Sequence, residues 1–128
     1  MTIRHVAIPV DDQAKALAFY TDVIGFELKH DIPVGEDRWL SLTAPAGSDE
    51  IELVLEPNKN PASKAYQAAL FEQGIPITGF VSDDIEGDYE RLVSKGVAFT
   101  QKVTEQGPVK LAVFADTCGN LIQIHQPT

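Results

Sequence analysis

The sequence predicts an α+β domain built from two copies of a βαβββ module. An Asp-Asp pair that can cap a helix occurs at Asp11-Asp12 and again, 72 positions later, at Asp83-Asp84. A glycine that can end the same helix follows in each half, at Gly25 and, 71 positions later, at Gly96. In both halves a strand-like segment precedes the aspartates and three strand-like segments follow the glycine, so the order of elements repeats.

The individual elements are indicated by alternating or β-branched segments for strands and by apolar residues at helical spacing for helices. In the first half we expect strands Ile3–Val10, Phe26–His30, Arg38–Thr43 and Glu50–Glu56, with a helix from Asp12 to Val23 or Ile24. In the second half we expect strands Ile75–Ser82, Val97–Lys102, Val109–Ala115 and Asn120–Gln126, with a helix between Asp84 and Gly96. Asn60-Pro61 opens a connecting helix that Gly74 ends. The expected organisation is one domain, 1–128, with module 1 at about 1–57, a linker helix at about 60–74 and module 2 at about 75–128.

Charge and cysteine content narrow the classes of partner. Ten basic and nineteen acidic residues give a net charge of −9, which disfavours nucleic acid and anionic membranes and favours cations, metal ions or positively charged small molecules. The same charge also serves solubility. The single cysteine, Cys118, excludes an intramolecular disulfide and a CxxC metal site. No segment has the apolar length of a membrane span or the pattern of an export leader, so we expect a cytoplasmic protein.

Strand alternation predicts which side chains share a face. In Glu50–Glu56 one face carries Ile51, Leu53 and Leu55, and the opposite face carries Glu52 with Glu50, Val54 and Glu56. In Asn120–Gln126 one face carries Ile122 and Ile124, and the opposite face carries Leu121, Gln123 and His125. The repeat offset pairs Glu52 with Gln123 and His5 with Ile77, so we expect these four positions to converge. The residues expected to line the same hollow are Trp39, Ser41 and Thr43, with Lys110, Ala112 and Phe114 as their counterparts.

The order and spacing of three segments resemble the vicinal oxygen chelate superfamily, which includes glyoxalase I, bleomycin-resistance proteins and type I extradiol dioxygenases. These segments are HVAIPVDDQAKALAFYTDVIGFEL, FVSDDIEGDYERLVSKGVAF and VFADTCGNLIQI, and the resemblance covers essentially the whole chain. It implies paired βαβββ modules that form a cupped, eight-stranded mixed sheet, with helices on the outer face and a small-molecule pocket inside. It also implies a homodimer.

The resemblance further implies one divalent metal ion, bound by residues of the first and last strands of each module. Carried over by position, the ligands in this sequence are His5, Glu52 and Gln123, whereas Ile77 at the fourth position cannot bind a metal. Each residue also has a simpler interpretation. His5 can be a hydrogen-bonded strand residue, Glu52 can pair with Lys110 or water, and Gln123 and His125 can be polar lining.

Two kinds of function remain open. Glyoxalase-type isomerisation needs a Lewis acid and a carboxylate base, which would be a zinc, nickel, cobalt or manganese ion and Glu52. The alternative is a metal-free protein that binds or sequesters a drug or metabolite, to which Trp39 and Ile77 are well suited, Trp39 by stacking on a flat ligand. Extradiol ring cleavage is disfavoured because iron would lack one histidine and its carboxylate, at the positions of Ile77 and Gln123. Fold alone does not identify the substrate.

Overall fold

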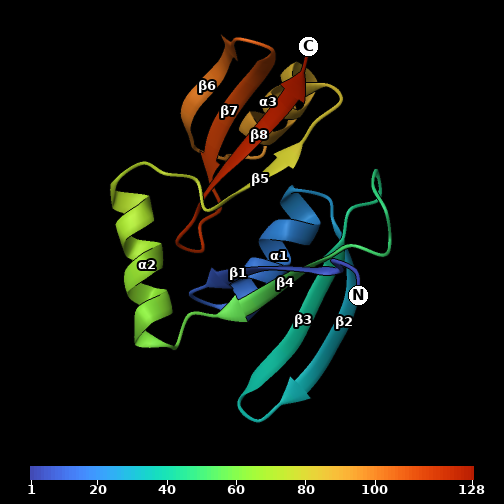
Figure 1. Cartoon of the computed structure of the whole chain (residues 1–128), viewed down its shortest axis with the longest axis vertical. Helices are drawn as coiled ribbons and strands as arrows, with labels where there is room; N and C mark the ends of the chain where they lie inside the picture. Colours follow the sequence, from blue (N-terminus) through green and yellow to red (C-terminus); the bar gives the residue numbers. More distant parts are fainter. The chain divides into compact units, whose positions relative to one another are not determined.

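The first half of the chain forms a βαβββ unit around a four-stranded sheet (Figure 1). The computed structural model describes all 128 residues. The elements of this half are β1 (His5–Val10), α1 (Gln13–Ala18) with its π-helical continuation η1 (Phe19–Val23), β2 (Glu27–Val34), β3 (Asp37–Thr43) and β4 (Glu52–Pro57). The strand order is β1-β4-β3-β2, with β1 and β4 parallel and the other neighbours antiparallel.

The second half repeats this topology after helix α2 (Pro61–Glu72). Its elements are β5 (Thr78–Val81), α3 (Ile85–Ser94), β6 (Phe99–Gln106), β7 (Val109–Ala115) and β8 (Leu121–Pro127). The strand order is β5-β8-β7-β6, so the predicted α+β class with two βαβββ modules is confirmed. The eight strands divide into two four-stranded sheets, and the chain divides into two compact units, Met1–Ala65 and Tyr66–Thr128. No helix combines the length and apolar character needed to cross a membrane.

The two aspartate pairs start the helices through their second member. Asp12 accepts a hydrogen bond from the Lys15 backbone N–H at 3.0 Å, and Asp84 accepts one from the Gly87 N–H at 3.1 Å. Each bond satisfies a backbone donor that has no partner within its helix. The repeat therefore has a physical basis in N-terminal capping.

Asp84→Ala is expected to lower the free energy of unfolding by about 1 kcal/mol, because the Gly87 N–H loses its acceptor. The matched control is Asp83→Ala, which removes the same charge from an exposed neighbour and is expected to change stability by less than about 0.5 kcal/mol. Chemical denaturation followed by circular dichroism measures both. Equal losses in the two variants would contradict the assignment of Asp84 as the cap.

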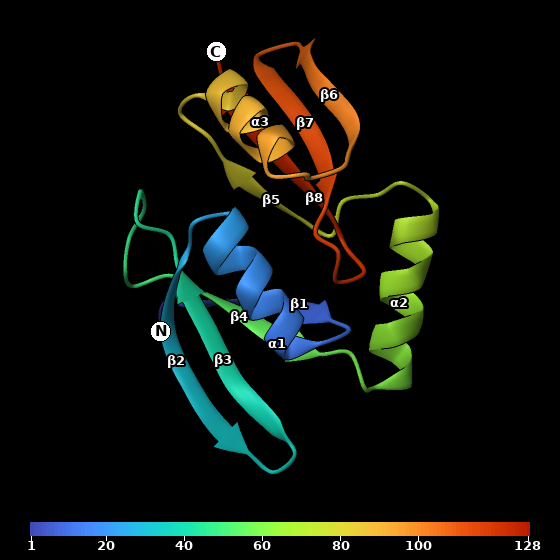
Figure 2. The same ribbon diagram turned by 180° about the vertical axis from the view of Figure 1, so that it is seen from behind.

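In each unit one helix covers one face of the sheet (Figures 1 and 2). Beneath α1 the buried apolar side chains come from three strands: Ile8, Val10, Leu40, Leu42 and Leu55. The Gln13 side chain joins α1 to the sheet, because its Nε2 donates to the carbonyl oxygens of Arg38 at 2.7 Å and Leu55 at 2.8 Å. This arrangement leaves the opposite face of the first sheet available for polar residues.

Strand β2 extends further than expected, to Val34 rather than His30. Proline cannot donate a hydrogen bond to a neighbouring strand, so Pro33 weakens the sequence signal for a strand at this point. Because β2 is the edge strand of its sheet, it tolerates this residue. The pairing of β2 with β3 also contains a bulge between Leu28 and His30.

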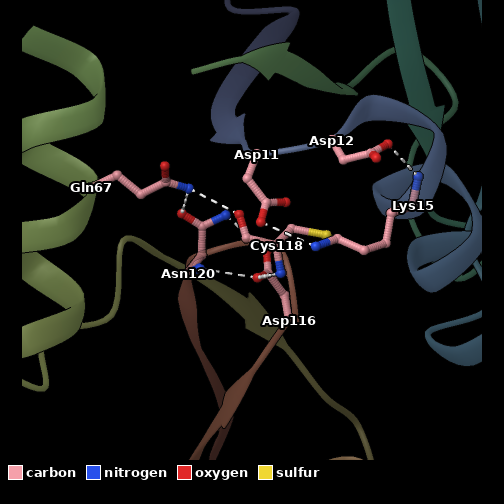
Figure 3. Close-up of polar contacts among 7 residues, drawn as sticks. All are labelled: Asp11, Asp12, Lys15, Gln67, Asp116, Cys118 and Asn120. Atoms are coloured by element: carbon pink, nitrogen blue, oxygen red, sulfur yellow. Dashed lines mark hydrogen bonds and ion pairs between the residues drawn. The ribbon is translucent and has the colours of Figure 1, made fainter. Parts of the chain in front are cut away.

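A buried polar network fixes the turn between β7 and β8 (Figure 3). Asp116 is completely buried and accepts hydrogen bonds from the backbone N–H groups of Cys118 at 2.7 Å and Asn120 at 3.0 Å. Its second carboxylate oxygen accepts from Asn120 Nδ2 at 2.8 Å. Gln67 of α2 donates to Asn120 Oδ1 at 3.0 Å and to the Cys118 carbonyl at 3.1 Å. This turn is therefore joined to α2 through side-chain amides.

Candidate functional site

Strands β1 and β4 place His5 opposite Glu52 on the face of the first sheet away from α1. The distance from His5 Nε2 to Glu52 Oε2 is 3.5 Å. Glu52 is buried, with 4% of its surface exposed, whereas about half of the His5 side chain, 49%, is exposed. A buried carboxylate in mid-strand requires compensating partners.

Ser41 and His30 supply two of these partners, both at the same carboxylate oxygen. The Ser41 hydroxyl donates to Glu52 Oε1 at 2.7 Å, and His30 Nδ1 lies 3.1 Å from the same atom. The Ser41 hydrogen bond, helped by the His30 hydrogen bond and the charge of Lys29, holds the pKa of Glu52 below its ordinary value, although burial opposes the shift. Glu52 is therefore an anion at neutral pH, with Oε1 fixed in position.

The bulge in β2 brings a third basic side chain to the carboxylate. Leu28 pairs with Leu42 and His30 pairs with Ser41, so Lys29 has no partner in the ladder. An unpaired residue interrupts strand alternation and allows consecutive side chains to approach one face. Lys29 Nζ lies 3.8 Å from Glu52 Oε2 and donates to the Asp49 carbonyl at 2.7 Å.

Sequence reasoning did not identify Lys29 and His30 as site residues. Their dipeptide lies at the end of the predicted strand Phe26–His30, where alternation would send the two side chains to opposite faces. A bulge leaves no periodic signature. The available clue was composition, because a histidine and a lysine in succession are unusual in a segment predicted to be half-buried.

Trp39 extends the cluster with an aromatic surface. Its ring makes an edge contact with the His5 ring, with centroids 5.3 Å apart and an interplanar angle of 76°. Trp39 is the single tryptophan of the chain, so its fluorescence reports on this face. The first unit thus brings together four of the predicted site residues: His5, Trp39, Ser41 and Glu52.

The second unit places Gln123 opposite Gly79 rather than opposite Ile77. Ile77 precedes β5, and its N–H donates to the Leu121 carbonyl at 2.9 Å. A Cβ atom at Gly79 would lie 4.0 Å from Gln123 Nε2, so the amide extends over a position without a side chain. By strand register, the counterpart of His5 is therefore Gly79, which differs from the expected Ile77.

Lys110 and Phe114 lie on the opposite face from Gln123 and His125, contrary to the expectation that all four line one surface. Lys110 pairs across the ladder with Gln126 and Phe114 pairs with Ile122, whereas Gln123 and His125 pair with Val113 and Leu111. Lys110 Nζ contacts Glu86 of α3 at 2.8 Å, and the fully buried Phe114 ring packs 5.6 Å from Phe99.

The expected and the observed faces of Lys110 and Phe114 differ because the sequence offset between the two modules is not the same for every strand. Ser41 pairs with Val54 and Leu111 pairs with His125, so β3 and β7 are related by 70 positions while β4 and β8 are related by 71. A shift of one residue exchanges the two faces of a strand. Leu111, rather than Ala112, is therefore the counterpart of Ser41. On the face of the second sheet that carries Gln123 and His125, the Nδ1 atom of His125 is buried without a hydrogen-bond partner.

The donor atoms of the first unit fit a divalent metal ion only in part. Two ligands of a tetrahedral zinc ion lie about 3.4 Å apart, close to the 3.5 Å between His5 Nε2 and Glu52 Oε2. However, Glu52 Oε1 already accepts two hydrogen bonds, and the Lys29 ammonium lies 3.8 Å from Oε2. No group of three or more His, Cys, Asp or Glu side chains has an arrangement suited to a metal ion.

Comparison with known proteins identifies the family. Residues 2–124 match the model of the Glyoxalase/Bleomycin resistance protein/Dioxygenase superfamily, and the chain belongs to this superfamily. It is 51% identical to YurT of Bacillus subtilis (strain 168) over 98% of this chain and 99% of that protein. Among solved structures, UcmS2 has a TM-score of 0.83 and 32% identity, covering 98% of this chain and 97% of its own. TnmS3, described as an antibiotic binding protein from Streptomyces sp. CB03234, has a TM-score of 0.78 and 31% identity, covering 100% and 97%.

Proposed function

We propose that the chain binds a small organic molecule on the sheet face that carries Glu52, and that binding needs no metal ion. The observation that carries this proposal is the buried Glu52 carboxylate, which protein groups already neutralise and orient. Ligand sites commonly combine a few fixed polar groups with aromatic surface. His5, His30 and Lys29 remain partly exposed around the carboxylate, and the Trp39 ring adjoins His5. The similarity to TnmS3 supports an antibiotic-like ligand.

The test is a titration of the purified protein with a panel of aromatic antibiotics, followed by Trp39 fluorescence with and without EDTA. We expect a saturable change for at least one compound, with a roughly micromolar Kd that EDTA leaves unchanged. Trp39→Phe serves as a signal control, because it removes the fluorescence while calorimetry can still detect the heat of binding. A panel without any saturable response would contradict the proposal, and so would binding that EDTA abolishes.

The second candidate function is a metal-dependent lyase or isomerase, favoured by the 3.5 Å separation between His5 Nε2 and Glu52 Oε2. His5 and Glu52 would supply ligands to one zinc, nickel, cobalt or manganese ion, and Glu52 would also serve as the base. Metal analysis of protein purified without chelators distinguishes the two candidates. About one ion per chain, lost in His5→Ala, would favour this second function. Homodimer formation and a cytoplasmic location stay predictions.

A further inference from the structure

We propose that Lys29 is the ligand-recognising cation of this site and that it binds an anionic oxygen, such as a carboxylate or sulfonate oxygen, of the small molecule. The inference rests on the proposed binding function and specifies the class of ligand. The first observation is the β2 bulge, which brings the Lys29 ammonium to the sheet face that carries Glu52. In a regular strand, Lys29 and His30 would point to opposite faces.

The Lys29 ammonium has donor capacity to spare. It carries three N–H groups, of which one donates to the Asp49 carbonyl at 2.7 Å. Its distance to Glu52 Oε2, 3.8 Å, exceeds the length of a hydrogen bond. About a third of the side chain, 34%, is exposed. An incoming oxygen can therefore reach the ammonium without displacing a strong protein contact.

Three other lysines of the chain are paired more closely with a carboxylate than Lys29 is. Lys15 lies 3.0 Å from Asp11, Lys59 lies 2.7 Å from Asp37, and Lys110 lies 2.8 Å from Glu86. In each of these pairs the carboxylate already occupies a donor of the ammonium. Lys29 shares its single carboxylate, Glu52, with Ser41 and His30, which hold the other oxygen of that group.

The immediate surroundings of Lys29 are less acidic than the chain as a whole. Three basic side chains, those of Lys29, His5 and His30, surround one carboxylate, although the net charge of the chain is −9. Lys29 alone balances the charge of Glu52, and the two imidazoles add polar contacts. A ligand anion beside Lys29 therefore meets no unbalanced negative charge within this cluster, and charge-assisted hydrogen bonds are the stronger kind.

The test compares two probes with the same aromatic framework. 8-Anilino-1-naphthalenesulfonate carries a sulfonate, and N-phenyl-1-naphthylamine does not. We expect the wild-type protein to bind the sulfonate more tightly. Lys29→Met should weaken sulfonate binding about tenfold and leave the affinity for the uncharged probe unchanged. Lys29→Arg, which keeps the charge, should retain most of the affinity. Fluorescence titration measures each Kd.

The control variant is Lys15→Ala, which removes the same charge from helix α1 and is expected to leave both affinities unchanged. Three results would overturn the proposal: no binding of the sulfonate, equal affinity for the two probes, or equal effects of Lys29→Met and Lys15→Ala. These results leave the broader binding function intact if the antibiotic panel still gives a saturable response. Failure of that panel is a separate outcome.

Discussion

Asp116→Ala is expected to lower the free energy of unfolding by roughly 3–5 kcal/mol, a large fraction of the stability of a small protein. The alanine leaves the buried N–H groups of Cys118 and Asn120 without their acceptor and removes the partner of Asn120 Nδ2. Water cannot readily replace these contacts, because all three residues are 2% exposed or less. Urea denaturation followed by circular dichroism measures the loss.

Asp116→Asn is the matched control for this experiment. The amide oxygen can still accept from the two backbone N–H groups, while the second acceptor is lost, so we expect a smaller destabilisation than for alanine. If the alanine variant lost less than about 1 kcal/mol, the network would not be the main constraint on this turn. The same result would show that the hydrogen bonds of the buried Gln67 amide to this turn contribute little to stability.

Glu52→Gln is expected to lower the free energy of unfolding by about 1–2 kcal/mol at neutral pH, because charge-assisted hydrogen bonds become neutral ones. The folded-state pKa of Glu52 is lowered, chiefly by Ser41. Its contribution is therefore fully present above the ordinary glutamate pKa of about 4.3 and is lost as the pH falls through the folded value. The difference between wild type and variant should shrink below a pH of about 4.

Denaturation followed by Trp39 fluorescence, at pH values of about 7 and about 3.5, measures this difference on the sheet that contains both residues. Glu50→Gln is the control, since Glu50 is an exposed carboxylate just before β4 and should show neither the loss nor its pH dependence. A stability difference that stays constant between the two pH values would show that the charge of Glu52 is not what stabilises the site.

The repeated fold was predictable because its signals are local. Asp12 and Asp84 cap helices, and Gly25 and Gly96 adopt positive φ angles of 95° and 85° after them. Such features depend on a few neighbouring residues, and they occur twice in the same order. Alternation likewise separated Glu52 from the apolar face of β4. These patterns carried the fold class without any information on contacts between distant residues.

The site was less predictable because it depends on the exact register of the strands and on contacts between residues that are distant in the sequence. The one-residue difference in offset between β3 and β7 reversed the expected faces of Lys110 and Phe114. The bulge concealed Lys29 and His30. Neither the strand register nor a bulge changes the composition of a segment, so hydrophobic patterns alone do not show which face of the sheet a given side chain occupies.

The unpaired residue in β2 also gives this surface a simple route to new chemistry. Because Leu28 and His30 already have adjacent partners in β3, loss of the lysine codon between them would leave every strand pair in place while deleting a positive charge. Relatives with the same sheet can therefore differ in the ligands they attract through a change of one codon that keeps the pairing of β2 with β3.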